Sequence, residues 1–306
     1  MKTKLIIEQH IHGAFGIDFN KANTKELLEV AEKLLKQGIG GFFPTLVTDS
    51  VENIKRQIKV IKDAKTHLTN VHADILGVHL EGIFINEKRK GIHNSEHFLE
   101  LTVENYKKLE DDIIKIVTLA PEHDIDLIDY LITKKVKVQA GHCESADLSK
   151  CNGVTHLFNA MKGISHRDTS TSLSALIDDN IYTEVIADGL HLNNDILKLI
   201  FTIKPKDKIL LISDALPITY SNVFETEFAD SKIYYDGKKA TSIDGTIAGS
   251  TTLVPQIIKR LIQKNMFDTI YINNMYNYNN ININGELEWN ESGEIVSVIK
   301  DNKKVL

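Results

Sequence analysis

Eight short apolar segments rich in β-branched residues recur along the chain, and segments with helical periodicity lie between them. The eight segments are residues 4–12, 38–46, 74–82, 113–122, 136–144, 153–160, 181–189 and 208–215. Strands that alternate with helices form βα units around a parallel sheet, and eight such units close into a barrel. The sequence therefore predicts an α/β fold, a (β/α)8 TIM-like barrel, over residues 1–268.

Three of the intervening helices have recognisable ends or periods. One begins with Asn23 and Glu26 at the spacing of a capping box and ends at Gly38. Residues 50–68 and 251–265 have the same apolar period as this first helix. We therefore expect α-helices at these three places.

The pattern changes after residue 268. Residues 271–286 are rich in Asn and Tyr without a helical period, so we expect a connector or an irregular strand there. Residues 285–306 alternate apolar and polar side chains around turn signals, which predicts two or three short strands. The second unit is expected to be a small C-terminal β segment over residues 269–306, packed on the barrel.

Composition excludes several classes of protein. The chain has 306 residues with 42% hydrophobic and 25% charged, as is usual for a globular protein, and a net charge of −6 that gives no general attraction for nucleic acid or anionic membranes. No segment approaches the roughly 18 apolar residues of a membrane span, and the N-terminus lacks a signal-peptide core. Two cysteines, Cys143 and Cys151, cannot build a disulfide framework. We expect a cytoplasmic protein with a small-molecule substrate.

Polar side chains collect at the ends of the predicted strands, where a βα barrel builds its active site. They are His10 and His12 in the first segment, His79 and Glu81 in the third, His142 in the fifth, His156 in the sixth, Asp188 and, just beyond it, His191 in the seventh, and Asp214 in the eighth. His10 and His12 are two residues apart on a strand and so share a face. Alone, such a pair is more often incidental than metal-binding, but a carboxylate and two further histidines at other strand ends favour a metal site.

Imidazoles mixed with carboxylates suit a divalent Zn, Fe, Mn, Co or Ni ion, and we expect one or two ions per chain.

Two residues near these candidate ligands are better interpreted as structural residues than as part of the metal site. His79 lies deeper than Glu81 on the same face, and we expect it to be a packed, hydrogen-bonded residue of the barrel. Cys143 should point away from the site as a small buried residue, which makes it a poor candidate for a nucleophile.

A set of motifs spread over residues 8–254 resembles the N-acetylglucosamine-6-phosphate deacetylases of the amidohydrolase superfamily. The matching stretches are HIHGAFGIDF, GVHLEGIFIN, KGIHN, LAPE, AGHCESA, THLFNAM, ADGLHL, LISDA and DGTIAGST. The resemblance implies an amidohydrolase-type barrel and hydrolysis of N-acetylglucosamine 6-phosphate to glucosamine 6-phosphate and acetate. It also implies a homodimer.

The resemblance assigns roles to individual residues. The implied metal ligands are His10, His12, Glu81, His142, His156 and Asp214. Asp214 would also take a proton from the attacking water and return it to the amine, while His93 would stabilise the oxyanion. The implied substrate-binding residues are Ile92, His93, Asn159, Ala160, Arg167, Asp188, His191, Ile247, Ala248 and Gly249.

The chain departs from the family pattern in three ways. Ile83 replaces the usual proline of HLEGP, and Cys143 replaces a usual serine. The β-sandwich segment that usually precedes the first strand is not found before His10, so we interpret residues 269–306 as a remnant of that sandwich. Two alternative functions stay open: an amidohydrolase for another N-acyl sugar or N-acyl amino acid, and a non-catalytic sugar-phosphate-binding descendant.

Overall fold

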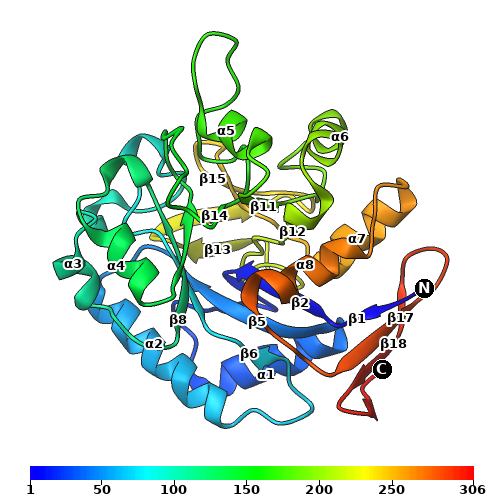
Figure 1. Cartoon of the computed structure of the whole chain (residues 1–306). Coiled ribbons are helices and arrows are strands. Elements are labelled where there is room, and N and C mark those ends of the chain that lie inside the picture. Colours follow the sequence, from blue (N-terminus) through cyan, green and yellow to red (C-terminus); the bar gives the residue numbers. More distant parts are fainter.

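A barrel of eight parallel strands forms the centre of the computed structural model, which describes residues 1–306 (Figure 1). Around the barrel the strands are β2 (Ile6–Ile11), β5 (Ile39–Leu46), β7 (Val78–Glu81), β8 (Ile114–Leu119), β9 (Lys137–Ala140), β10 (Gly153–Val154), β11 (Tyr182–Val185) and β12 (Ile209–Leu211). A parallel bridge between Ile11 and Ala215 joins the first strand to the residues after the last. Each strand lies within one of the eight predicted segments, so the predicted barrel is confirmed.

Helices surround the barrel on its outer side (Figure 1). They are α1 (Thr24–Lys36), α2 (Val51–Thr66), α3 (Val103–Lys107), α4 (Leu127–Thr133), α5 (Thr171–Ile177), α6 (Asn194–Ile203), α7 (Val254–Gln263) and α8 (Ile270–Asn279). Short 3-10 helices are η1 (Glu87–Arg89), η2 (Ser95–His97), η3 (Pro121–His123) and η4 (Lys206–Lys208). None of the helices combines the length and apolarity that a membrane crossing requires.

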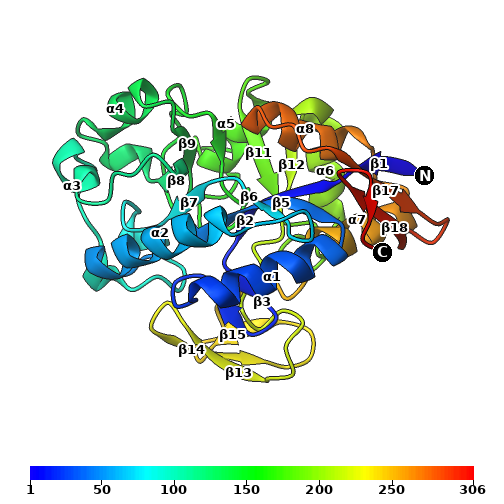
Figure 2. The ribbon, with the colours of Figure 1, turned by 90° about the horizontal axis from the view of Figure 1, so that it is seen from below.

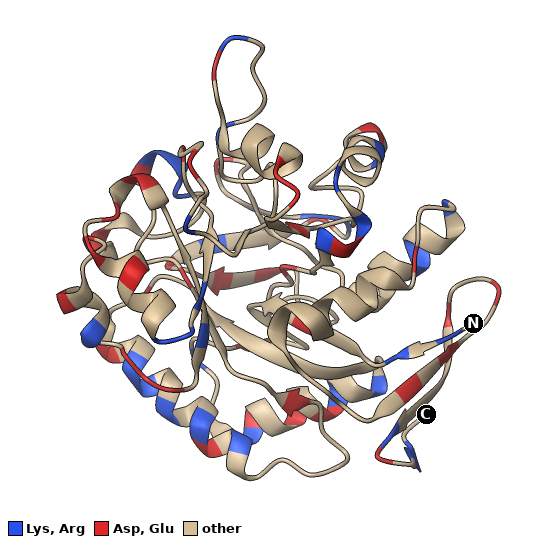
Figure 3. Cartoon of the chain, in the orientation of Figure 1, with Lys and Arg blue, Asp and Glu red and all other residues tan.

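Helix α1 forms for the reasons that its sequence suggests. The Asn23 side chain accepts a hydrogen bond from the Glu26 N–H at 3.1 Å, and the Glu26 carboxylate accepts from the Asn23 N–H at 2.8 Å. This capping box satisfies two backbone donors at the start of the helix. Charged residues lie along the outer sides of α1 and α2, of both signs on α1 and mostly basic on α2 (Figure 3), while the apolar stripe packs on the barrel. The helices predicted at residues 50–68 and 251–265 are also present, as α2 and α7.

Helix α8 contradicts the prediction of a connector or irregular strand. The helix buries residues on several sides, so its sequence has no amphipathic period. Its polar side chains bond to backbone at the N-terminal ends of barrel strands: Tyr276 Oη donates to the Leu5 carbonyl at 2.8 Å, and Asn274 Nδ2 donates to the Ile209 carbonyl at 2.7 Å. Tertiary contacts thus override the low helix propensity of Asn and Tyr.

The final strands were predicted correctly, but their sheet also includes the N-terminus. Strand β17 (Gly285–Trp289) lies between β1 (Lys2–Lys4) and β18 (Ile295–Lys300), and β19 (Lys303–Lys304) completes an antiparallel sheet. Figure 1 shows both termini at this sheet. Leu287 and its buried neighbours belong to the same hydrophobic core as the barrel strands. The predicted domain boundary after residue 268 stays a prediction.

A second antiparallel sheet follows β12 and was missed in the sequence. It consists of β13 (Glu225–Phe228), β14 (Ser231–Tyr235), β15 (Ala240–Ser242) and β16 (Ile247–Gly249). Figure 2 shows it on the opposite side of the barrel from α8. β3 (Gly13–Ala14), which follows β2, pairs with β4 (Ile17–Asp18), whereas β6 (Asp74–Ile75) pairs with the N-terminal half of β5. The sheet of β13–β16 therefore stands at the C-terminal ends of the barrel strands.

The terminal sheet should contribute to the stability of the barrel. Leu287 is fully buried, so Leu287→Ala is expected to lower the free energy of unfolding by about 2–4 kcal/mol through lost contacts and a residual cavity. Val296→Ala on the neighbouring strand is the control, since Val296 is 49% exposed and its loss should change stability by no more than about 0.5 kcal/mol. Denaturant unfolding measures both. Equal, small effects would show that the sheet is not part of the cooperative core.

Candidate metal centre and substrate pocket

The candidate ligands stand at the C-terminal ends of the barrel strands. His10 lies within β2 and Glu81 ends β7, whereas His142, His156 and Asp214 come two or three residues after β9, β10 and β12. These last three residues have positive φ angles of 48°, 30° and 56°. A left-handed backbone costs a non-glycine residue about 1–3 kcal/mol and persists where the surroundings hold it, as is common at functional sites.

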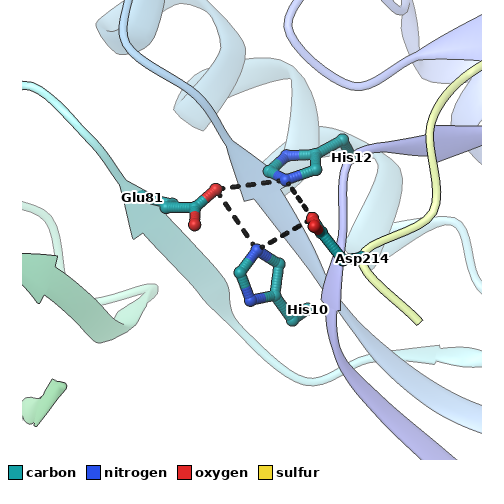
Figure 4. A group of neighbouring side chains, drawn as sticks. All are labelled: His10, His12, Glu81 and Asp214. Carbon is teal, nitrogen blue, oxygen red and sulfur yellow. Dashed lines mark hydrogen bonds and ion pairs between the residues drawn. The ribbon is translucent and has the colours of Figure 1, made fainter. Parts of the chain in front are cut away.

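Four of the candidates form one group around the first strand (Figure 4). Oε2 of Glu81 lies 3.2 Å from Nε2 of His10 and 3.1 Å from Nε2 of His12. Oδ1 of Asp214 lies 3.4 Å and 3.0 Å from the same two nitrogens. Two imidazoles and two carboxylates therefore converge on one small volume.

The other oxygen of Glu81 faces a second pair of histidines. Oε1 lies 3.3 Å from Nε2 of His142 and 3.0 Å from Nε2 of His156. These two nitrogens are themselves only 3.1 Å apart. Glu81, which is 2% exposed, thus stands between two groups of imidazoles and offers one oxygen to each.

Hydrogen bonds on the far side of three rings place a proton on Nδ1. Nδ1 of His10 donates to Glu184 at 3.0 Å, Nδ1 of His12 to the Thr45 carbonyl at 3.3 Å, and Nδ1 of His142 to the Arg89 carbonyl at 2.8 Å. Each of these partners can only accept, so a neutral ring keeps its Nε2 lone pair free. Nε2 of His10 is buried and makes no hydrogen bond. This donor set fits a divalent cation.

The charges at the site also favour a cation. Burial alone would lower the pKa of His10, but the carboxylates of Glu81, Glu184 and Asp214 outweigh it and raise that pKa well above its usual value. Burial raises the pKa of Glu81, yet the nearby histidines hold it well below the usual range. Buried carboxylates of this kind need a positive charge beside them, which a proton or a metal ion can supply.

His79 is not a ligand in this arrangement, as the sequence predicted. Its Nδ1 donates to the Gln9 carbonyl at 3.0 Å, and its Nε2 accepts from the Thr118 hydroxyl at 2.8 Å. Burial and the neighbouring His10 lower the pKa of His79 to about 4, so the ring is neutral. Both nitrogens are used, and none is left for a cation.

Glu184 is a site residue that the sequence analysis missed. The residue is fully buried on β11 and accepts from Nδ1 of His10, while its second oxygen accepts from Gln9 Nε2 at 2.6 Å. Gln9 in turn accepts from Asn279 of α8 at 2.9 Å. Glu184 lies in the middle of the predicted segment 181–189 and not at its end, so its position carried little signal. Its place behind His10 makes it the residue that orients this ligand.

The centre lies at the base of a pocket of about 280 Å³. Most of the predicted site residues line it: His12, Glu81, Ile92, His93, His142, His156, Asn159, Ala160, His191, Asp214, Ile247, Ala248 and Gly249. His10 is buried beneath them. The lining also includes Lys88, Arg89 and Phe228, which the sequence analysis did not single out. Phe228 comes from β13, so the missed sheet forms part of the pocket wall.

Two of the predicted substrate-binding residues lie outside the lining. Asp188 accepts from Nδ1 of His191 at 2.8 Å and from the Ser250 hydroxyl at 3.1 Å, so it positions His191 instead of facing the pocket. Arg167 is exposed on the segment between β10 and α5, which projects from the barrel in Figure 1. No contact in this chain brings Arg167 to the pocket.

A (β/α)8 barrel with histidines and carboxylates gathered at its strand ends is the arrangement typical of amidohydrolase-type metal-dependent hydrolases. The chain is 33% identical over 259 residues to the N-acetylglucosamine-6-phosphate deacetylase of Bacillus subtilis, and the aligned region covers 80% of this chain and 65% of that protein. It is 31% identical over 283 residues to the protein of the same name from Bos taurus, and this aligned region covers 84% of this chain and 68% of that protein. The chain thus spans about two thirds of the length of these relatives. It belongs to the N-acetylglucosamine-6-phosphate deacetylase family.

The fold has a close counterpart among solved structures. A mutant of N-acetyl-D-glucosamine-6-phosphate deacetylase from Mycobacterium smegmatis superposes with a TM-score of 0.92 at 21% identity, covering all of this chain and 87% of that one. No family model matches the chain. At this identity the superposition speaks for the fold alone.

Glu184 should control the affinity of the centre for metal. Glu184→Gln removes the negative charge behind His10 and allows the ring to turn or change tautomer, so one metal ion should bind about 10–100-fold more weakly. Metal titration against a competing chelator measures this directly. Gln139→Leu is the control, because Gln139 is equally buried in the barrel but does not contact His10. Unchanged metal affinity in Glu184→Gln would contradict the orienting role.

Proposed function

We propose that this chain hydrolyses the acetamide of N-acetylglucosamine 6-phosphate to glucosamine 6-phosphate and acetate. The observation that carries the proposal is the Glu81-centred cluster of histidines at the base of the pocket, with Asp214 beside it. Family membership supports the same reaction. The related structure from Mycobacterium smegmatis is a complex with N-acetyl-D-glucosamine-6-phosphate.

We propose that the centre holds two divalent ions that share Glu81. His10, His12 and Asp214 would hold one ion with Oε2 of Glu81, and His142 and His156 would hold the other with Oε1. Such ions would supply Lewis acidity for the amide carbonyl and for the attacking water. The mixed nitrogen and oxygen donors suit Zn, Fe, Mn, Co or Ni.

Asp214 is proposed as the residue that moves the proton. Its side chain is 11% exposed and lines the pocket, so it reaches both the buried centre and the substrate. The carboxylate would take a proton from the attacking water and deliver it to the amide nitrogen as the C–N bond breaks. Without that proton the amine would be a poor leaving group.

His93 is proposed to donate a hydrogen bond to the developing oxyanion. The ring is 4% exposed and lines the pocket, with its centroid 4.6 Å from that of His142. Burial and the neighbouring His142 hold the pKa of His93 well below its usual value, so the ring is neutral at physiological pH. A neutral imidazole donates one hydrogen bond and does not compete with the metal ions as a positive charge.

The sugar phosphate would be bound by the cations of the pocket and by a partner chain. Lys88 has no acidic partner, whereas Arg89 pairs with Glu144 at 3.0 Å, so Lys88 is the better placed of the two to meet a phosphate. We propose that the chain forms a homodimer in which Arg167 of one chain contacts the phosphate held by its partner. The exposed position of Arg167 supports this arrangement.

We also propose a cytoplasmic location, because the two free thiols of Cys143 and Cys151 suit a reducing compartment.

Asp214→Asn tests the proton transfer. The substitution keeps the size of the side chain but removes the base, so acetate release should fall by roughly 10²–10⁴-fold. An acetate-release assay on metal-loaded protein gives the rate, and binding of N-acetylglucosamine 6-phosphate shows that the pocket is intact. Substrate binding without acetate release in the wild type, and no effect of Asp214→Asn, would favour the non-catalytic sugar-phosphate-binding alternative.

Substrate preference tests the phosphosugar assignment. A charge-assisted hydrogen bond contributes about 1.5–3 kcal/mol, so kcat/KM for N-acetylglucosamine 6-phosphate should exceed that for N-acetylglucosamine by at least about tenfold. Lys88→Ala should narrow this ratio, whereas Lys108→Ala, an exposed lysine outside the pocket lining, should not. Equal efficiency on the two sugars would instead favour an amidohydrolase for another N-acyl compound.

A further inference from the structure

Thr48 and His93 form a hydrogen-bonded pair that the proposed reaction does not yet use. Thr48 lies two residues after β5 and is 2% exposed. Its Oγ1 is 2.8 Å from Nδ1 of His93 and also 2.8 Å from the backbone N of Ile83, the second residue after Glu81. The hydroxyl thus connects the backbone beside one candidate ligand to the ring of His93.

The number of available hydrogens decides the direction of this bond. The Ile83 N–H can only donate, so it must donate to Oγ1 of Thr48. The structure shows no acceptor for the Thr48 hydroxyl hydrogen other than Nδ1 of His93. If Nδ1 carried the proton instead, the buried hydroxyl hydrogen would have no partner, which is unfavourable. Nδ1 of His93 therefore accepts.

Gly82 provides independent evidence that this contact shapes the site. Its φ angle is +109°, a conformation that side chains rarely adopt. A Cβ on this residue would overlap Oγ1 of Thr48 and would lie 2.8 Å from Nδ1 of His93. The glycine after Glu81 thus leaves the space in which the threonine and the histidine meet.

We propose that Thr48 is a positioning residue that fixes the tautomer of His93 with its proton on Nε2. This inference rests on the proposed function of His93 as the donor to the oxyanion. A neutral ring with an accepting Nδ1 has one donor, Nε2–H, and that donor belongs to a residue of the pocket lining. When they are neutral, His10, His12 and His142 have the opposite tautomer, with the proton on Nδ1, because the partner of each Nδ1 can only accept. The partner at Nδ1 therefore distinguishes these three candidate metal ligands from the hydrogen-bond donor, whereas Nδ1 of His156, the fourth candidate, makes no hydrogen bond.

Nuclear magnetic resonance of ¹⁵N-histidine-labelled, zinc-loaded protein tests the tautomer directly. Protonated and unprotonated imidazole nitrogens have clearly different ¹⁵N shifts, and His93→Gln identifies the signals of His93. We expect an unprotonated Nδ1 and a protonated Nε2 in the wild type. A protonated Nδ1 in the wild type would overturn the proposal, whether or not the chain has deacetylase activity.

Kinetics of Thr48→Val test the consequence for the reaction. Valine keeps the volume of threonine but cannot donate to Nδ1, so kcat should fall roughly tenfold or more while KM and metal content stay near their wild-type values. Thr48→Ser should restore both kcat and the ¹⁵N shifts. Thr183→Val is the control, because Thr183 is a buried barrel threonine whose hydroxyl has no hydrogen-bond partner.

The outcomes separate this proposal from the proposed function. An inactive wild type with the expected tautomer would overturn the deacetylase assignment and leave the Thr48 contact standing. An active wild type whose kcat does not change in Thr48→Val would overturn the positioning role alone. A fall in kcat that Thr48→Ser fails to restore would also overturn it, since the hydroxyl would then not be the cause.

Discussion

The rest of the site depends on the placement of one buried carboxylate, Glu81. Its two oxygens lie 3.0–3.3 Å from four imidazole nitrogens that come from three different barrel strands or the residues following them. A carboxylate that is 2% exposed is costly in a protein interior unless positive charge compensates it. The barrel makes this arrangement possible because the C-terminal ends of its parallel strands meet around one axis.

The hydrogen-bond partner at Nδ1 distinguishes three candidate metal-binding histidines from His93. Glu184, the Thr45 carbonyl and the Arg89 carbonyl accept from Nδ1 of three candidate ligands, whereas Thr48 donates to Nδ1 of His93. The same side chain can therefore bind a cation in one place and donate a hydrogen bond in another. Glu184 further connects His10 through Gln9 to helix α8 on the far side of the barrel. The orientation of His10, a candidate metal ligand, thus depends on packing well outside the pocket.

Much of the barrel and of the centre could be predicted from the sequence. The eight strand segments have a strong apolar pattern, and candidates such as Glu81 and His142 stand at or just after the strand ends, where the fold requires an active site. Helix α8 could not be predicted, because its buried asparagines and tyrosines are stabilised by contacts distant in sequence. Glu184 and Thr48 were missed for a related reason: their roles come from partners 174 and 45 residues away. Arg167 was assigned through the family resemblance, as a residue that follows the FNAM motif, but no contact within one chain brings it to the pocket.

The most direct test of the central claim is the number of metal ions bound by the purified chain. Elemental analysis of wild-type protein after equilibration with a divalent metal should give two ions per chain, because Glu81 offers one oxygen to each group of histidines. The double substitution His10→Ala and His12→Ala should leave one ion, held by His142, His156 and Glu81. A wild type that binds only one ion, with the same content in the double variant, would contradict the two-ion centre.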